Sequence, residues 1–273
     1  MTERWLELDW EGQRRRALLQ GRAGSAPVPL IVALHGTGGT SRLMAKITGL
    51  SGRAPGLVLY PAALGEPGSE DPARGAAWNA GPGLGNPAFP DADDVGFLRA
   101  LIARVREEAL VDAARIHLAG LSNGGRMAYR LALEAADLFA SMAVVAGSWD
   151  GSGPTPSRPV STLIFHGTAD HHIPYEGGLG AKGRRIVHQS APETAFAWAK
   201  VMGCAPKIHR SVAGPHHLDL ARGADGTEVG LWTVQGQGHA WPGGRAWAPT
   251  ADAPVMDLDA MGLILDFFAR HPR

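Results

Sequence analysis

Cysteine is almost absent from the 273-residue sequence, which contains only Cys204. One cysteine cannot form an intramolecular disulfide or a cysteine-based zinc site, so the fold does not depend on an oxidising compartment. An excess of charge of either sign is also missing, because Lys and Arg total 26 and Asp and Glu total 26. Proteins that bind nucleic acids use a basic excess to displace counterions from the phosphates. The charge balance therefore argues against a nucleic acid as partner.

Long apolar segments are missing as well. The longest uncharged, apolar-rich stretch lies between Asp137 and Asp150 and is well short of the roughly 20 residues that a membrane helix needs. The first residues, Met1–Trp5, include charged side chains and no apolar segment of the kind found in secretory signal peptides. For the chain as it stands we expect a cytoplasmic location and no membrane partner, with secretion as the alternative if a leader was removed. The oligomeric state is left open.

What the sequence does contain is a series of short apolar runs separated by helical patterns. The runs are rich in Val, Ile and Leu and are bounded by Gly or Pro, which is typical of strands covered on both faces. They are Pro29–Leu34, Gly56–Tyr60, Ile116–Ala119, Met142–Ala146 and Val160–Phe165. The helical patterns are Asp91–Leu110, Gly124–Ala136, Ala191–Met202 and Val255–Ala269. Such alternation predicts a mostly parallel α/β sheet with helices on both faces.

The N-terminal residues predict a different local structure. Leu6, Leu8 and Trp10 alternate with acidic residues, and Gly12 permits a turn into Arg15–Gln20. This pattern predicts an antiparallel hairpin before the parallel strands. Because the chain shows no repeat and no change of composition, we expect one domain over residues 1–273.

The pentapeptide Gly120-Leu121-Ser122-Asn123-Gly124 has the form G-x-S-x-G. It follows the apolar run at Ile116–Ala119 and precedes the helical pattern. That order is typical of a nucleophile elbow, a sharp strand-to-helix turn in which the serine has a strained backbone and the glycines avoid clashes. Taken alone, the same residues also fit a Gly-rich turn whose serine caps the helix.

A serine hydroxyl is a weak nucleophile at neutral pH and needs a base. In enzymes with such an elbow, an acid and then a histidine follow the serine in the chain. Asp170 follows the run Val160–Phe165, and His239 lies in a loop after the apolar run Glu228–Val234. The carboxyl ends of parallel strands meet at one edge of a sheet, so we expect Ser122, Asp170 and His239 to converge there.

Other side chains compete for these roles. Asp150, at the end of the preceding apolar run, is the alternative acid, although Asp170 is favoured. His166 lies within its strand and is expected to be packed rather than to act as the base. The adjacent His216 and His217 would face opposite ways in extended chain, which makes a poor joint metal site. We expect neither a metal ion nor an organic cofactor.

A Gly-rich turn, His35-Gly36-Thr37-Gly38-Gly39, directly follows the first apolar run. The tetrahedral intermediate of acyl transfer carries negative charge on the former carbonyl oxygen, and fixed N–H groups must face it. This turn can supply one such donor, and the residue after the nucleophile, Asn123, can supply another. The turn matches neither a G-x-G-x-x-G loop nor a P-loop, which argues against nucleotide binding.

Several segments together resemble a known family. They are HGTGG at 35–39, GLSNGG at 120–125, HGTADHHIPY at 166–175 and GHAWPGG at 238–244, with Trp78–Gly81 and Asp93–Leu98 as further matches. The set, which extends from about Arg15 to Phe268, is similar to the α/β-hydrolase esterases grouped as polyhydroxybutyrate depolymerase-like and feruloyl esterase-like. The resemblance implies a single-domain α/β-hydrolase fold. It also implies a catalytic triad of Ser122, Asp170 and His239, with oxyanion donors at the amides of Thr37 and Asn123.

The sequence thus predicts hydrolysis of carboxylic esters through an acyl-enzyme. Polyester oligomers, feruloyl or acetyl esters and short-chain acyl esters are the candidate substrates. A serine peptidase or acyltransferase that uses the same triad is the first alternative. A non-catalytic α/β-hydrolase scaffold that binds a ligand or a protein partner is the second.

Two segments and two tryptophans are expected to shape the substrate pocket. Segment 61–90 is rich in Gly and Pro and too long for a simple connection, and segment 203–226 is a second candidate, interrupted by a strand at Lys207–Val212. Both are predicted to be active-site loops. Trp78 and Trp241 are candidate substrate walls, with packing in the core as an equally weighted alternative.

Overall fold

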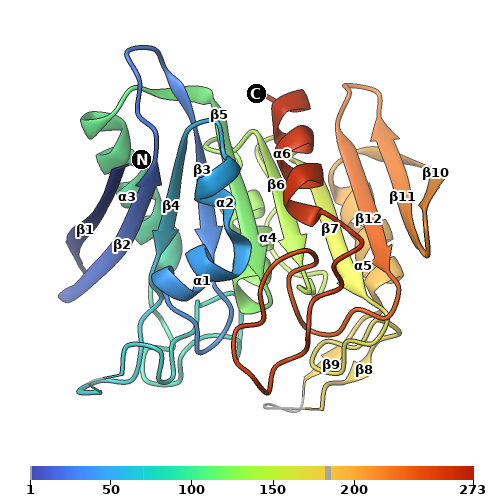
Figure 1. Cartoon of the computed structure of the whole chain (residues 1–273), viewed down its shortest axis with the longest axis horizontal. Coiled ribbons are helices and arrows are strands. Elements are labelled where there is room, and N and C mark those ends of the chain that lie inside the picture. The colour runs from blue at the N-terminus through green and yellow to red at the C-terminus, as the bar shows by residue number, and fades with distance from the viewer. Residues whose placement is uncertain (1, 70, 182–185) are drawn as a thin grey trace.

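The computed structural model describes residues 2–69, 71–181 and 186–273, so Glu70 of the segment 61–90 lies outside the described residues. Its main feature is a ten-stranded sheet (Figure 1). In spatial order the strands are β1 (Thr2–Trp10), β2 (Gln13–Gly21), β4 (Leu57–Pro61), β3 (Val28–Leu34), β5 (Val111–Leu121), β6 (Ser141–Val145), β7 (Ser161–Gly167), β12 (Glu228–Val234), β11 (His216–Gly223) and β10 (Cys204–Ala213). A separate antiparallel pair consists of β8 (Gly178–Leu179) and β9 (Val187–His188).

The central strands of the sheet run parallel. Parallel pairing joins β4, β3, β5, β6, β7 and β12 in turn. The N-terminal hairpin of β1 and β2 pairs antiparallel with β4. The predicted mostly parallel sheet with an N-terminal antiparallel hairpin is therefore confirmed.

Helices cover both faces of the sheet, as predicted. Figure 1 shows α1 (Ser41–Thr48), α2 (Leu50–Arg53) and α6 (Ala260–Arg270) in front of it, and α3 (Asp94–Glu108), α4 (Asn123–Glu134) and α5 (Ala191–Val201) behind it. Each set packs into its own apolar cluster against one side of the strands. In α3, which lies within the predicted helical pattern Asp91–Leu110, the apolar residues Val95, Leu98, Ile102 and Val105 share one stripe and are buried. Helix α1 was not predicted, because it has only eight residues and buries only two large apolar side chains, Met44 and Ile47.

The prediction of an active-site loop over 203–226 is wrong. Most of the segment forms β10 and β11, which pair antiparallel and extend the sheet beyond β12. β10 is the edge strand, and its apolar side chains Ile208 and Val212 are exposed. The strand predicted within the segment at Lys207–Val212 is confirmed, since it lies inside β10, whereas β11 was not predicted.

A buried ion pair attaches the N-terminal hairpin to α3. Arg15 Nη2 lies 2.6 Å from Asp94 Oδ1, and both side chains are almost fully enclosed. The guanidinium also stacks on the ring of Phe97, with 3.9 Å between its carbon and the ring centroid. The second carboxylate oxygen of Asp94 accepts the N–H of Asn79 at 2.7 Å. The pair therefore fixes segment 61–90 as well as the hairpin.

We expect Arg15→Met to lower the free energy of unfolding by about 3–5 kcal/mol, because it leaves a buried carboxylate without its cation. Denaturant unfolding monitored by tryptophan fluorescence measures the loss. The double variant Arg15→Met/Asp94→Asn removes both charges and is expected to be more stable than the single variant. Arg99→Met, which breaks an exposed pair with Asp137, is the control and should change stability by no more than about 1 kcal/mol. Equal losses in the two arginine variants would contradict the prediction.

Candidate active site

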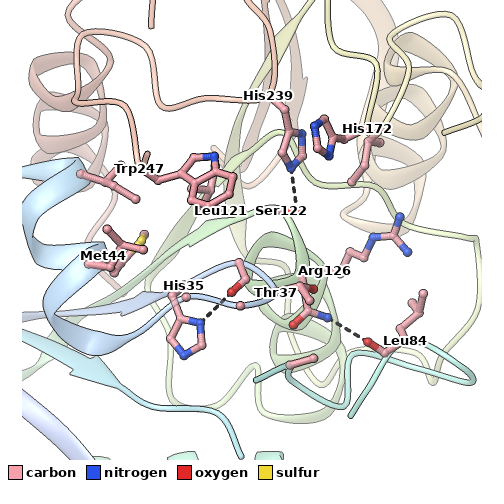
Figure 2. Close-up of a pocket in the computed structure, with 18 of the residues that line it drawn as sticks. His35, Thr37, Met44, Leu84, Leu121, Ser122, Arg126, His172, His239 and Trp247 are labelled. Carbon is pink, nitrogen blue, oxygen red and sulfur yellow. Dashed lines mark hydrogen bonds between the residues drawn. The ribbon is translucent and has the colours of Figure 1, made fainter. Parts of the chain in front are cut away.

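Three parallel strands, β5, β7 and β12, end at the same edge of the sheet, with β6 between the first two, and deliver three polar side chains to that edge. Ser122 follows β5, Asp170 lies in the loop after β7, and His239 lies in the loop after β12. His239 Nε2 is 2.8 Å from Ser122 Oγ, and His239 Nδ1 is 2.7 Å from Asp170 Oδ2 (Figure 2). The structure thus brings together all three residues singled out from the sequence, which are separated by up to 117 positions.

The backbone at Ser122 is strained. Its φ of 56° and ψ of −118° lie outside the region that residues with a side chain normally adopt. The flanking glycines permit this turn, since a Cβ on Gly120 would lie 2.3 Å from the carbonyl oxygen of Gly124. A Cβ on Gly124 would lie equally close, 2.3 Å, to the carbonyl oxygen of Leu34. The G-x-S-x-G spacing is therefore a requirement of close backbone packing where β5 turns into α4.

Asp170 is buried and fully engaged. Its Oδ1 accepts the backbone N–H groups of His172 at 2.8 Å and Ile173 at 3.0 Å, while Oδ2 faces His239. Burial by itself would raise the pKa of Asp170, but the interactions with His239, together with the charge of His166 and the N–H of Ile173, outweigh burial and lower it. An ionised carboxylate can only accept, so His239 donates from Nδ1, and its Nε2 lone pair is left to accept the hydroxyl hydrogen of Ser122.

Two further residues hold His239 in place. Its backbone N–H donates to Asp252 Oδ2 at 2.6 Å, and its ring stacks on that of His172, with centroids 4.6 Å apart and planes at 15°. Sequence reasoning missed Asp252, whose position in the chain carries no motif. Its carboxylate anchors the loop that carries His239.

The Gly-rich turn at 35–39 packs directly against the elbow. A Cβ on Gly36 would lie 3.1 Å from Ser122 Cβ. The Gly36 carbonyl accepts from His35 Nδ1 at 2.8 Å and from the Gly39 N–H at 3.0 Å. In a trans peptide the C=O and the N–H that follows it point in opposite directions. The two hydrogen bonds to the Gly36 carbonyl therefore also fix the direction of the Thr37 N–H.

The amides of Thr37 and Asn123 both belong to residues that line one cavity with Ser122. Within the part of the chain that the structure describes, neither amide N–H donates to another group. Asn123 is the first residue of α4, where N–H groups have no partner inside the helix. Their role as oxyanion donors stays a prediction.

His35 and His166 are packed side chains, as expected for His166. His35 Nε2 accepts the N–H of Ala63 at 3.1 Å, and burial lowers its pKa to about 4, so the ring is neutral. His166 is buried, and its Nε2 donates to the carbonyl of Ile173 at 2.8 Å. Asp150, the alternative acid, lies in an exposed loop and accepts from Ser152.

The side chain of Asn123 ties segment 61–90 to the elbow. Its Oδ1 accepts the N–H of Trp78 at 2.7 Å, and its Nδ2 donates to the carbonyls of Trp78 and Leu84, each at 3.1 Å. Ala77, Leu84 and Gly85 from this segment line the cavity.

The predictions that Trp78 and Trp241 form substrate walls are wrong. Both side chains are 0% exposed, and neither lines the cavity. The indole of Trp78 is turned inward, where Nε1 donates to the carbonyl of His35 at 3.0 Å. Trp241 packs in the apolar cluster beneath α1 and α6. The tryptophan that does line the cavity is Trp247, which is 50% exposed and was missed.

The cavity beside Ser122 has a volume of about 470 Å³, enough for a small organic ligand. Its lining differs on the two sides of Ser122 (Figure 2). Met44 and Trp247 give one side an apolar lining, whereas the other side carries the polar side chains of Arg126 and His172 beside the apolar Leu84. This second side is called the polar side of the cavity.

Among the described residues, no group of three or more His, Cys, Asp or Glu side chains could hold a metal ion. No helix in the described ranges combines the length and apolar character that crossing a membrane requires.

Known proteins share sequence with this chain. A feruloyl esterase B of Piromyces equi is 35% identical over 185 residues, which are 65% of this chain but only 33% of that protein. The putative esterase NocK of Nocardia uniformis subsp. tsuyamanensis is 33% identical over 249 residues, 84% of this chain and 68% of that protein. No family model matches the sequence. The feruloyl esterase part of the resemblance is confirmed, and the polyhydroxybutyrate depolymerase part stays a prediction.

A solved structure shares the fold. Native pOPH superposes with a TM-score of 0.61 at 19% identity, covering 100% of this chain and 88% of that one. At 19% identity the similarity shows a common fold and nothing about function.

Proposed function

The chain belongs to the α/β-hydrolase esterases related to the feruloyl esterases, and from this premise we propose that it hydrolyses carboxylic esters through an acyl-enzyme on Ser122. One observation carries the proposal: hydrogen bonds run without interruption from Ser122 Oγ through His239 to Asp170. A hydroxyl, an imidazole and a buried carboxylate in this order form an activated nucleophile. The arrangement needs no metal ion for this chemistry.

In the first half-reaction, Ser122 Oγ attacks the ester carbonyl carbon while His239 Nε2 takes its proton. Asp170 stabilises the resulting imidazolium, whose Nδ1–H already points at its carboxylate. The negative charge that develops on the carbonyl oxygen would be held by the amides of Thr37 and Asn123. Each such donor typically lowers the activation barrier by about 3–4 kcal/mol. The carbon–oxygen bond of the ester then breaks, and the alcohol leaves with the proton from His239.

In the second half-reaction, water replaces the alcohol. The water oxygen attacks the acyl carbon while His239 takes a proton from the water. The bond between the acyl carbon and Ser122 Oγ then breaks. His239 returns the proton to Ser122, and the carboxylic acid is released. Both half-reactions use the same base and the same oxyanion site.

The cavity supports a small acyl or aryl ester as substrate. Its apolar side offers aliphatic surface and the indole of Trp247 to a hydrocarbon chain or an aromatic ring. Feruloyl esters agree with the relative's name, and acetyl or short-chain acyl esters also fit within about 470 Å³. Polyester oligomers remain a further candidate.

We expect diisopropyl fluorophosphate to modify the protein once, on Ser122, and to abolish hydrolysis of p-nitrophenyl butyrate. Only a serine with an adjacent base displaces fluoride quickly, and peptide mass spectrometry locates the modified residue. Excess ester should slow the labelling. A panel of p-nitrophenyl esters of increasing acyl length, methyl ferulate and a hydroxybutyrate oligomer then identifies the preferred substrate.

Three outcomes would contradict the proposal. Labelling of another residue would identify that residue, and not Ser122, as the nucleophile. Neither labelling nor ester turnover would favour the non-catalytic scaffold. Hydrolysis of an anilide at a rate that rivals the matched ester would favour a peptidase.

A further inference from the structure

Arg126 lines the cavity on its polar side. It lies in the first turn of α4, four residues after Ser122, and is only 8% exposed. Figure 2 shows its side chain on the opposite side of Ser122 from Met44 and Trp247. A ligand that reaches Ser122 therefore lies between an apolar wall and a guanidinium.

The guanidinium has few partners. A guanidinium carries five N–H donors, and among the described residues only one hydrogen bond uses them, from Nη2 to His188 Nδ1 at 2.9 Å. No carboxylate in the described part of the chain forms an ion pair with it, although Asp150 attracts it from a greater distance. Burial lowers the pKa of Arg126 to about 10, so it remains a cation at neutral pH.

His188 accepts from Arg126 and does not compensate its charge. Burial, followed by the charge of Arg126, lowers the pKa of His188 to about 4, so the ring is neutral. Its Nδ1 also lies 3.3 Å from the hydroxyl of Ser148. Among the described residues, the polar side of the cavity thus presents the cation of Arg126 beside the neutral ring of His188.

A buried cation without an anion is unfavourable unless a ligand supplies the anion. The planar fork of a guanidinium matches the two oxygens of a carboxylate, and such a bond is stronger than one between neutral groups. Resting on the proposed esterase activity, we propose that the preferred ester substrates carry a free carboxylate, which Arg126 binds while Ser122 attacks the ester carbonyl. The apolar wall then takes the uncharged part of the same substrate.

Paired substrates test this proposal. For a carboxylate on the acyl side, the pair is mono-p-nitrophenyl adipate and p-nitrophenyl methyl adipate. For one on the alcohol side, the pair is 4-acetoxybenzoate and 4-acetoxybenzamide. For each enzyme the measured quantity is the ratio of kcat/KM for the anionic ester to kcat/KM for its neutral partner.

In the wild-type protein we expect this ratio to exceed about 10 in one of the pairs, as one charged hydrogen-bonded contact predicts. Arg126→Met, which keeps an unbranched apolar side chain and removes the charge, should lower the ratio about tenfold or more, mainly through KM. Arg126→Lys should retain part of the preference. Arg104→Met removes an exposed arginine of α3 and should leave the ratio unchanged.

Each result decides the inference. Wild-type ratios at or below one in both pairs would overturn it, even if Arg126→Met did not fold. A preference for the anionic ester that survives in Arg126→Met would place the carboxylate elsewhere. If neutral esters are hydrolysed without any anionic preference, only this inference fails; if no ester is hydrolysed and Ser122 is not labelled, the proposed function fails.

Discussion

Ser122→Ala is expected to lower kcat for p-nitrophenyl butyrate by about 10⁶-fold. The expectation follows from the geometry, in which His239 Nε2 faces the hydroxyl of Ser122 at 2.8 Å. Without that oxygen no acyl-enzyme forms, and only binding and the oxyanion donors are left. Stopped or continuous release of p-nitrophenol, corrected for the uncatalysed rate, measures the loss.

Ser152→Ala provides the matched control, because Ser152 is an exposed serine in the loop after β6 and its hydroxyl donates to Asp150. Its turnover should equal that of the wild type. Circular dichroism tests whether both variants are folded. A folded Ser122→Ala protein with wild-type turnover would show that another group performs the attack.

Asp170→Asn is expected to lower kcat by about 10⁴-fold with little change of fold. An amide in this position can donate to His239 Nδ1, which forces the ring hydrogen onto Nε2. Nε2, which faces Ser122, can then no longer accept the proton of the hydroxyl. The amide also carries no charge to stabilise the imidazolium. The same p-nitrophenyl butyrate assay measures the effect.

Asp150→Asn is the informative comparison, since Asp150 is the alternative acid that the sequence offers. Its carboxylate lies in an exposed loop and accepts from Ser152, so we expect its turnover to stay close to that of the wild type. If Asp150→Asn proved the more damaging of the two, the roles of the two aspartates would be exchanged.

The triad candidates were predictable because each depends on local sequence and strand order. The glycines around Ser122 are required by contacts shorter than 3 Å at the turn itself, so the motif reports the geometry directly. Asp170 and His239 follow short apolar runs, and parallel strands bring their carboxyl ends to the same edge. The N-terminal hairpin was predictable for a similar reason, the alternation at Leu6, Leu8 and Trp10.

The tryptophans show where this reasoning ends. Trp241 and Trp247 belong to the same Gly- and Pro-rich loop, yet the first is fully buried and the second lines the cavity. Which of the two faces the cavity depends on how α1 and α6 pack against the loop. Helix α1 lies far before the loop in the chain, and α6 follows it. In segment 203–226 the strand at Lys207–Val212 was predictable, but its partner β11 and the pairing of both with β12 were not.

By itself, then, the sequence determined the N-terminal hairpin, the central parallel strands and the longer helices, the elbow at Ser122 and the chain order of nucleophile, acid and base, because periodicity, glycine and strand ends act over a few residues. The tertiary structure alone decided which side chains face the cavity and which charges have partners. Arg15 meets Asp94, Asp252 anchors His239, and Arg126 is left without an acidic partner among the described residues. Such pairings join segments that are distant in the chain, and no local pattern records them.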